Sequence, residues 1–305
     1  MRKKSPFILL FSALMIGLVW GLYFYFFSRP KYIKLSVHYL SCSDMPLIEA
    51  EIEKKKYRLE WDSGSNAYLA LHKEILDNIP AKQEHSFWNF IDLKGNSYKE
   101  PQFLLPYISF NGHKFRPMLA YQENMQFQTE GCCIERAKQL DEIRDMLESI
   151  HGSIGMGLFQ DLCLFFDLPH SLIYIAKEKD AMWKEKIFLQ EDFVETALSG
   201  GMTAVIVTYS EGVPKRFLLD TGATYSILKD PSLPELNILS IEHMVIEGVD
   251  FGPQDFIIYN FSDRHSEFDG ILGIDFFKKH AIFLDMKNRR AWINPKDQSV
   301  SALQK

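Results

Sequence analysis

The chain has 305 residues, 47% of them hydrophobic and 24% charged, which is enough for one large or two medium domains with a sizeable core. Its formal net charge is −6 and it has no long basic stretch, so nucleic acid is a poor candidate partner. None of the four cysteines has metal-ligand spacing with a histidine, and we expect neither a metal nor another cofactor.

The first apolar segment runs from Pro6 to Phe27, carries no charge, and is long enough to cross a bilayer as a helix. A cleaved signal peptide is the alternative, but the segment is long and aromatic, and no small-x-small cleavage site follows it. We therefore predict an uncleaved signal anchor over 6–27. Residues 1–5 would lie in the cytosol, and the rest of this single-pass membrane protein would be periplasmic or lumenal.

A half-buried strand is predicted next, because the stretch from Pro46 to Trp61 alternates apolar and polar residues. It leads into Asp62-Ser63-Gly64, an acid followed by a small hydroxyl residue and a glycine. Further on, the stretch from Phe90 to Phe110 predicts a β-hairpin with its turn near Lys94-Gly95-Asn96.

A helix and a glycine motif follow. Apolar residues recur at helical spacing between Cys132 and Ile150. The sequence GSIGMGLFQD then begins at Gly152. A charged segment from Ala176 to Lys186 comes after it and is the natural linker to the second part of the chain.

The second part of the chain repeats the first. The sequence YRLEWDSGSNAYLAL matches KRFLLDTGATYSILK, which places Asp62 on Asp220, 158 positions later. GSIGMGLFQD at Gly152 matches GILGIDFFKK at Gly270, and a weaker match between them pairs FNGHKFRP with IEGVDFGP. Chance does not easily give three matches in the same order, so we interpret the chain as a duplicated domain.

Each unit is predicted to be mainly β. Residues Met202 to Leu219 indicate two strands joined by a turn at Ser210 to Gly212. After the second glycine motif we expect a short helical stretch from Asp275 to Lys279, then strands from Ala281 to Leu284 and from Ala291 to Ile293.

The motifs LLDTGAT and DGILGIDFF, in a chain with two such units, resemble the retropepsin and pepsin superfamily of aspartic proteases. The first-lobe motifs are looser, with Glu60 in place of an apolar residue two positions before the acid. The resemblance implies a mainly β, bilobal fold with a cleft between the lobes and one catalytic aspartate in each, Asp62 and Asp220. The expected division is a first lobe over 35–176, a linker over 177–190, a second lobe over 191–295 and a tail over 296–305.

Two such acids also suit the chemistry. Peptide hydrolysis by an acid pair requires two close carboxyls that share one proton, one acting as base on a water while the other donates to the scissile carbonyl. Ser63 and Thr221 are placed to hydrogen-bond across to the opposite loop, and Gly64 and Gly222 would let the backbone turn tightly beside each acid. The predicted function is an aspartic endopeptidase.

The resemblance also implies a flap, a β-hairpin that covers the cleft. The predicted hairpin of residues 90–110 has the right place in the chain, with Gly95 in its turn and Tyr98 as the candidate to hang over the acids. A plain surface hairpin is the alternative. The second copy has little room for a hairpin between Leu228 and Ile246, so a single flap is expected.

Two alternatives stay open. A catalytically inactive, membrane-tethered protein of the same fold would bind peptides or proteins instead of cutting them. The cysteines, Cys42, Cys132, Cys133 and Cys163, would form one or two disulfides in an oxidising compartment or remain buried thiols. The expected partners are a peptide or protein substrate and the membrane, and the duplicated lobes would form a monomeric pseudo-dimer.

Overall fold

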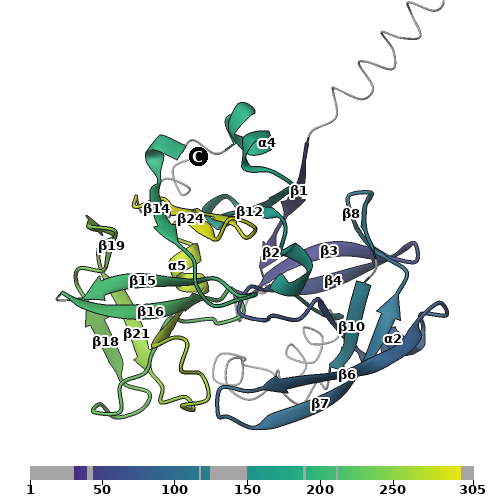
Figure 1. Ribbon diagram of the computed structural model, residues 1–305, viewed down its shortest axis with the longest axis horizontal. Helices are drawn as coiled ribbons and strands as arrows, with labels where there is room; N and C mark the ends of the chain where they lie inside the picture. Colours follow the sequence, from purple (N-terminus) through teal and green to yellow (C-terminus); the bar gives the residue numbers. More distant parts are fainter. Residues whose placement is uncertain are drawn as a thin grey trace, which may run out of the picture.

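The computed structural model of the protein describes residues 31–39, 44–116, 118–123, 150–187, 190–210 and 212–296. This part is mainly β, in three sheets with a few short helices (Figure 1). Among the described residues, no helix is long and apolar enough to cross a membrane. The predicted anchor over 6–27 and almost all of the helix predicted from Cys132 to Ile150 lie outside them.

A ten-stranded sheet forms the first lobe, and in Figure 1 it occupies the purple and blue side of the molecule. Its strands are β2 (His38–Tyr39), β3 (Pro46–Ile52), β4 (Lys55–Asp62), β5 (Leu69–His72), β6 (Gln83–Ile91), β7 (Ser97–Leu105), β8 (Ile108–Phe110), β9 (His113–Phe115), β10 (Met118–Glu123) and β11 (Gly152–Gly155). Helix α2 (Lys73–Asp77) follows β5. The neighbours run β6-β7-β10-β5-β11-β4-β3-β8-β9, with β2 beside β3.

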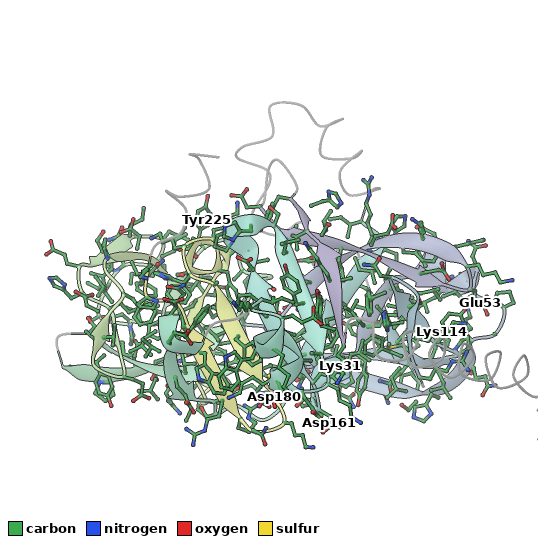
Figure 2. All side chains as sticks on the ribbon, turned by 90° about the horizontal axis from the view of Figure 1, so that it is seen from above. Lys31, Glu53, Lys114, Asp161, Asp180 and Tyr225 are labelled. Carbon is green, nitrogen blue, oxygen red and sulfur yellow. The ribbon has the colours of Figure 1, made fainter. Side chains whose placement is uncertain are left out.

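One strand prediction in this lobe is wrong. The stretch from Pro46 to Trp61 is a hairpin of two antiparallel strands, β3 and β4, and not a single strand. Glu53 and Lys54 make its turn with φ of 49° and 68°, the left-handed pair that a two-residue hairpin turn requires. Figure 2 shows Glu53 at the outer end of the first lobe, away from the second.

An eight-stranded sheet forms the second lobe, in the order β18-β21-β17-β22-β16-β15-β19-β20. Its strands are β15 (Val205–Ser210), β16 (Val213–Leu219), β17 (Ile227–Leu228), β18 (Ile238–Ile241), β19 (Val245–Ile246), β20 (Val249–Asp250), β21 (Gln254–Ile258) and β22 (Gly270–Leu272). The two strands predicted within Met202 to Leu219 are confirmed by β15 and β16. The predicted short helix is α5 (Ile274–Phe277).

A six-stranded sheet joins the lobes, in the order β1-β13-β12-β23-β24-β14. Its strands are β1 (Tyr32–Ser36), β12 (Cys163–Asp167), β13 (Leu172–Ala176), β14 (Val194–Ala197), β23 (Ile282–Asp285) and β24 (Arg290–Ile293). Strands β23 and β24 confirm the last two predicted strands to within one residue. Because β12 of the first half pairs with β23 of the second, the lobes are fastened together by backbone hydrogen bonds. The elements between β11 and β14 are the 3-10 turns η2 (Met156–Phe159), η3 (Leu168–His170) and η4 (Gln190–Asp192) and helix α4 (Lys179–Lys184).

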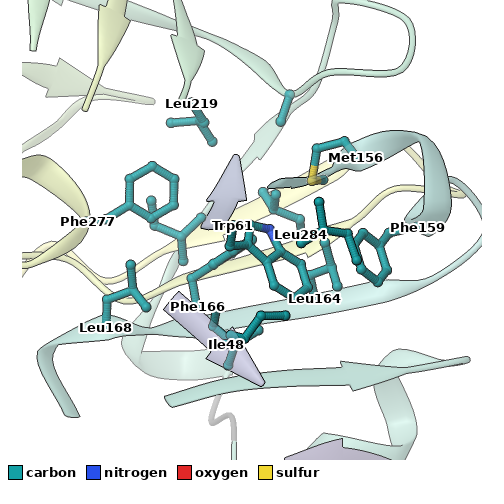
Figure 3. Packing of buried hydrophobic residues seen from close by; sticks show 14 of the residues in the cluster. Ile48, Trp61, Met156, Phe159, Leu164, Phe166, Leu168, Leu219, Phe277 and Leu284 are labelled. Carbon is teal, nitrogen blue, oxygen red and sulfur yellow. The ribbon is translucent and has the colours of Figure 1, made fainter. Parts of the chain in front are cut away.

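The core beneath the lobes also draws on both halves (Figure 3). Trp61 stacks on Phe159 with ring centroids 4.6 Å apart and meets Phe166 edge-on at 5.6 Å. Leu219 and Phe277 of the second half belong to the same cluster. Trp61 and Leu219 directly precede the two acids, so this fully buried packing fixes where each acidic loop begins.

The duplication is visible in the backbone. Strand β4 runs parallel to β11, with Gly155 opposite Asp62, and β16 runs parallel to β22 in the same way. The weak third match corresponds to two equivalent hairpin turns. Asn111 and Gly112 have φ of 47° and 82°, and Glu247 and Gly248 have 48° and 80°. The two lobes are therefore copies of one unit.

Candidate active site

The two predicted acids meet at the junction of the lobes. Asp62 ends β4, Asp220 directly follows β16, and their carboxyls lie close enough for each to shift the pKa of the other. The glycines of the two loops make room for this. A Cβ on Gly64 would collide with the Asp220 carboxyl, and one on Gly222 would lie 3.0 Å from the Asp62 carboxyl carbon. Each acid therefore lies against the glycine of the opposite loop.

This corrects the predicted role of the two glycines. Neither Gly64 nor Gly222 is among the residues with positive φ, so the turns do not require the left-handed freedom of glycine. Glycine is required because the opposite carboxyl approaches too closely for any side chain.

Ser63 and Thr221 connect the two loops through four reciprocal hydrogen bonds. Ser63 Oγ donates to Leu219 O at 2.9 Å, and Thr221 Oγ1 donates to Trp61 O at 2.5 Å. In return, Ser63 N donates to Thr221 Oγ1 at 3.1 Å, and Thr221 N donates to Ser63 Oγ at 2.9 Å. Both side chains are fully buried, so the separation of the acids is held by bonds that water does not reach.

Backbone donors orient each carboxyl. Gly64 N and Ser65 N both donate to Asp62 Oδ1 at 3.0 Å, and Gly222 N donates to Asp220 Oδ1 at 2.8 Å. These donors fix the orientation of both carboxyls.

The pKa of both acids is raised above the ordinary aspartate value. Burial, followed by the charge of Asp220, raises the pKa of Asp62 well above its ordinary value. Burial also raises the pKa of Asp220. Backbone N–H donors oppose the rise in both acids by stabilising the charged form, Ser65 and Gly64 at Asp62 and Gly222 at Asp220. Both shifts favour a state in which the pair holds one proton between its two carboxyls.

A cavity of about 700 Å³ contains both carboxyls, a size typical of ligand sites. Walls from both lobes enclose it, and the first-lobe hairpin covers it. Among the residues that line it are Trp88, Phe90, Leu93, Tyr121, Met202, Leu218, Arg264, Phe268 and Ile271. Its lining is thus part apolar and part charged.

The predicted flap is the hairpin of β6 and β7, and Gly95 in its turn has φ of 88°. Tyr98 does not lie over the acids. Its hydroxyl donates to Asp92 Oδ2 at 3.1 Å, and its ring stacks on its cross-strand neighbour Phe90 at 5.0 Å. The hydrogen bond to Asp92, at the start of the turn, holds the Tyr98 hydroxyl on the hairpin.

Tyr121 is the tyrosine that lines the cavity beside the acids. It lies on β10 and stacks on Trp88 of the flap with centroids 6.1 Å apart. Burial raises its pKa, and so do the charges of Glu123 and Asp62. No motif marks this residue in the sequence, because only the pairing of β10 with β5 and β7 brings it to the cleft.

Glu60 is a further buried acid. In the sequence it stands out only because the aspartic-protease motif has an apolar residue at this position. Burial raises its pKa well above the usual range, followed by the charges of Asp62 and Glu123. Glu123 Oε2 in turn lies 3.8 Å from the buried His72 Nε2. The equivalent of Glu60 in the second lobe is Leu218, so this acidic cluster belongs to the first lobe alone.

The described residues contain no group of three or more histidine, cysteine, aspartate or glutamate side chains arranged to hold a metal ion. Cys163 is a free, buried thiol, and burial raises its pKa to about 12. Cys42, Cys132 and Cys133 lie outside the described residues, so the predicted disulfides stay a prediction.

No protein-family model and no curated protein matches the chain. Two solved structures match over nearly its whole length. Basic 7S globulin from soybean aligns with a TM-score of 0.58 and 9% identity, over 90% of this chain and 97% of the globulin. Conglutin gamma, a basic 7S globulin from lupine seeds, aligns with a TM-score of 0.55 and 9% identity, over 91% of this chain and 97% of conglutin gamma. At this identity the likeness shows the fold alone: the chain has a mainly β, pepsin-like fold.

Proposed function

We propose that the protein is an aspartic endopeptidase with short, retropepsin-like lobes. One observation supports this above all: the Asp62 and Asp220 carboxyls, each against the glycine of the opposite loop, line one cleft, and Ser63 and Thr221 hydrogen-bond their loops together. A merely structural pair of acids would not be expected to face a cavity of about 700 Å³ under a hairpin.

In the proposed reaction, Asp220 takes a proton from a water whose oxygen attacks the scissile carbonyl carbon. Asp62 gives its proton to the carbonyl oxygen, so the first product is a neutral gem-diol. The C–N bond then breaks as the nitrogen takes the proton from Asp220. One gem-diol hydroxyl returns its proton to Asp62, which restores the starting state of both acids and leaves a carboxylic acid and an amine.

The second candidate function is a catalytically inactive module that binds peptides or proteins. The comparisons favour it over the peptidase, because both matched proteins are named globulins and not peptidases. The geometry of the acid pair favours catalysis. The two candidates differ in what the acids do, and substitution separates them.

We further propose that residues 6–27 anchor the chain in a membrane, with the lobes outside the cytosol as a monomeric pseudo-dimer. The uncharged span after three basic residues supports this. A reporter fused after Lys305 should be exported and should stay with membranes in a carbonate wash. Cytosolic behaviour of the fusion would contradict the proposal.

The test of the main proposal uses the full chain with Asp62→Asn, Asp220→Asn, both together, and Asp161→Asn as a control on an exposed acid (Figure 2). Each single substitution should abolish hydrolysis of a peptide library, and the double variant should lose no more, because the acids act as a unit. Peptide binding that survives every substitution, with no turnover by the unsubstituted chain at acid or neutral pH, would favour the binding module.

A further inference from the structure

The tip of the flap is hydrogen-bonded to the opposite lobe. Arg264 Nη1 donates to Gly95 O and to Ser97 Oγ, both at 2.8 Å. His265 Nε2 donates to Asp92 O at 2.8 Å. In Figure 1 the hairpin of β6 and β7 extends across from the first lobe towards the loop that follows β21. The hairpin therefore bridges the cleft instead of ending over it.

The fit at this contact is close. Ser262 N donates to Leu93 O at 2.8 Å, and a Cβ on Gly95 would collide with Ser262 Oγ. The turn itself is rigid, since the Asp92 carboxylate accepts hydrogen bonds from the backbone and the side chain of Asn96. We call the contact between residues 92–97 and residues 262–265 the latch.

Leu93 carries an apolar side chain into the second lobe. It packs against a buried cluster in that lobe: Val205, Leu218, Phe261, Phe268 and Ile271. Leu93 also lines the cavity of the acids together with Leu218, Phe268 and Ile271. Leu218, on β16, lies two residues before Asp220, so this apolar wall is next to the acid of the second lobe.

We propose that the Leu93 side chain occupies the apolar pocket of the second lobe and competes with the substrate for it. A substrate would bind by placing an apolar side chain of similar size where Leu93 lies in the closed flap. The latch holds the pocket closed until then. A leucine-like side chain restores the apolar burial that is lost when the flap lifts, whereas a charged one would be desolvated without a partner. This proposal rests on the proposed function in one respect, namely that the entering molecule is a substrate. The latch itself would equally gate a binding module.

Opening of the latch can be measured without any activity, by hydrogen exchange in the full chain. The amide of Ser262 reports directly, because its proton is bonded to Leu93 O. Arg264→Ala and Leu93→Ala should each speed its exchange by about fivefold or more, since each removes a stabilising contact. Ser97→Ala removes the hydrogen bond that Ser97 Oγ accepts from Arg264. It should speed exchange of the Ser262 amide less, and should have no effect in the Arg264→Ala background.

A matched control is Arg290→Ala. This arginine is on the shared sheet, 3.7 Å from Glu195, and should leave the exchange of the Ser262 amide unchanged. Unchanged exchange in both Arg264→Ala and Leu93→Ala, in chains that remain folded by circular dichroism, would overturn the latch.

The pocket is tested with two peptides that carry a hydroxyethylene group in place of the scissile bond and differ only in its flanking residues, leucine or lysine. The leucine peptide should bind more tightly than the lysine peptide. Arg264→Ala should lower the Kd of the leucine peptide by the same factor by which it speeds exchange of the Ser262 amide. Equal binding of the two peptides, or no gain in the variant, would overturn the competitor role. Absence of hydrolysis in the unsubstituted chain would refute only the peptidase, because neither measurement depends on turnover.

Discussion

The two lobes place one acid each with nearly the same backbone, yet surround it differently. Trp61, Asp62 and Ser63 correspond to Leu219, Asp220 and Thr221, and the hydrogen bonds between the two loops are reciprocal. Two positions before the acid, however, the first lobe has a buried glutamate and the second has a leucine. Duplication therefore supplies the geometry, while substitutions around it give the two acids different surroundings.

The first prediction tests whether the two lobes are equivalent, by adding a methyl group to each glycine where the two acidic loops meet. Gly64→Ala should lower kcat/KM by more than about a hundredfold, because its Cβ would displace the Asp220 carboxyl from the reacting position. Gly222→Ala should lower it by only about tenfold, because its Cβ would be 3.0 Å from Asp62. Peptide hydrolysis by the two variants checks this, and equal losses would show that the loops tolerate both alike.

The second prediction removes one side of the reciprocal bonding. Thr221→Val should destabilise the protein by about 2 to 4 kcal/mol, because it leaves the buried Trp61 O and Ser63 N without partners. Thr221→Ser keeps the hydroxyl and serves as the control. Chemical denaturation measures both, and a Thr221→Val variant as stable as Thr221→Ser would show that the loops are held by packing alone.

The third prediction concerns Glu60, whose pKa is raised by burial and by the charge of Asp62. A carboxyl with a raised folded-state pKa contributes stability below its ordinary pKa, and that stability is lost as the pH rises through the folded value. Glu60→Leu should therefore raise the free energy of unfolding more at pH 7 than at pH 4, by on the order of 1 to 3 kcal/mol, with a matching difference in the thermal midpoints.

The control for this prediction is Glu74→Gln, an exposed acid in the same lobe, which should shift the midpoint little at either pH. A Glu60→Leu variant whose effect is the same at both pH values would mean that Glu60 is ionised in a well-solvated site.

The smallest expected effect separates two tyrosines. Tyr121→Phe should lower kcat/KM by a few-fold to about tenfold, because its hydroxyl lies in the cavity within the field of Asp62. Tyr98→Phe should change it less, since its hydroxyl is bonded to Asp92 in the flap. If steady-state kinetics show a larger loss of kcat/KM for Tyr98→Phe than for Tyr121→Phe, Tyr98 would act over the acids, as the sequence predicts.

The acid pair could be predicted from the sequence because the repeat carries it: Asp62-Ser63-Gly64 is matched 158 positions later by Asp220-Thr221-Gly222. The sheet that joins the lobes could not, since β12 and β23 meet only through tertiary packing. The same holds for Tyr121 and for the latch, where Arg264 reaches a residue 169 positions away. Local patterns predict strands and turns, whereas contacts between distant segments need the assembled fold.

The most direct test of the account is the protonation of the two acids in the full chain, followed by NMR with 13C-labelled aspartate carboxyls. Assignment uses the Asp62→Asn and Asp220→Asn variants. The account predicts that at pH 6 one carboxyl is protonated and the other ionised, that the protonated one is Asp62, and that its signal moves only at higher pH. Two carboxyls that both titrate near the ordinary aspartate value of about 3.9 would contradict it, because independent acids cannot act as one catalytic pair.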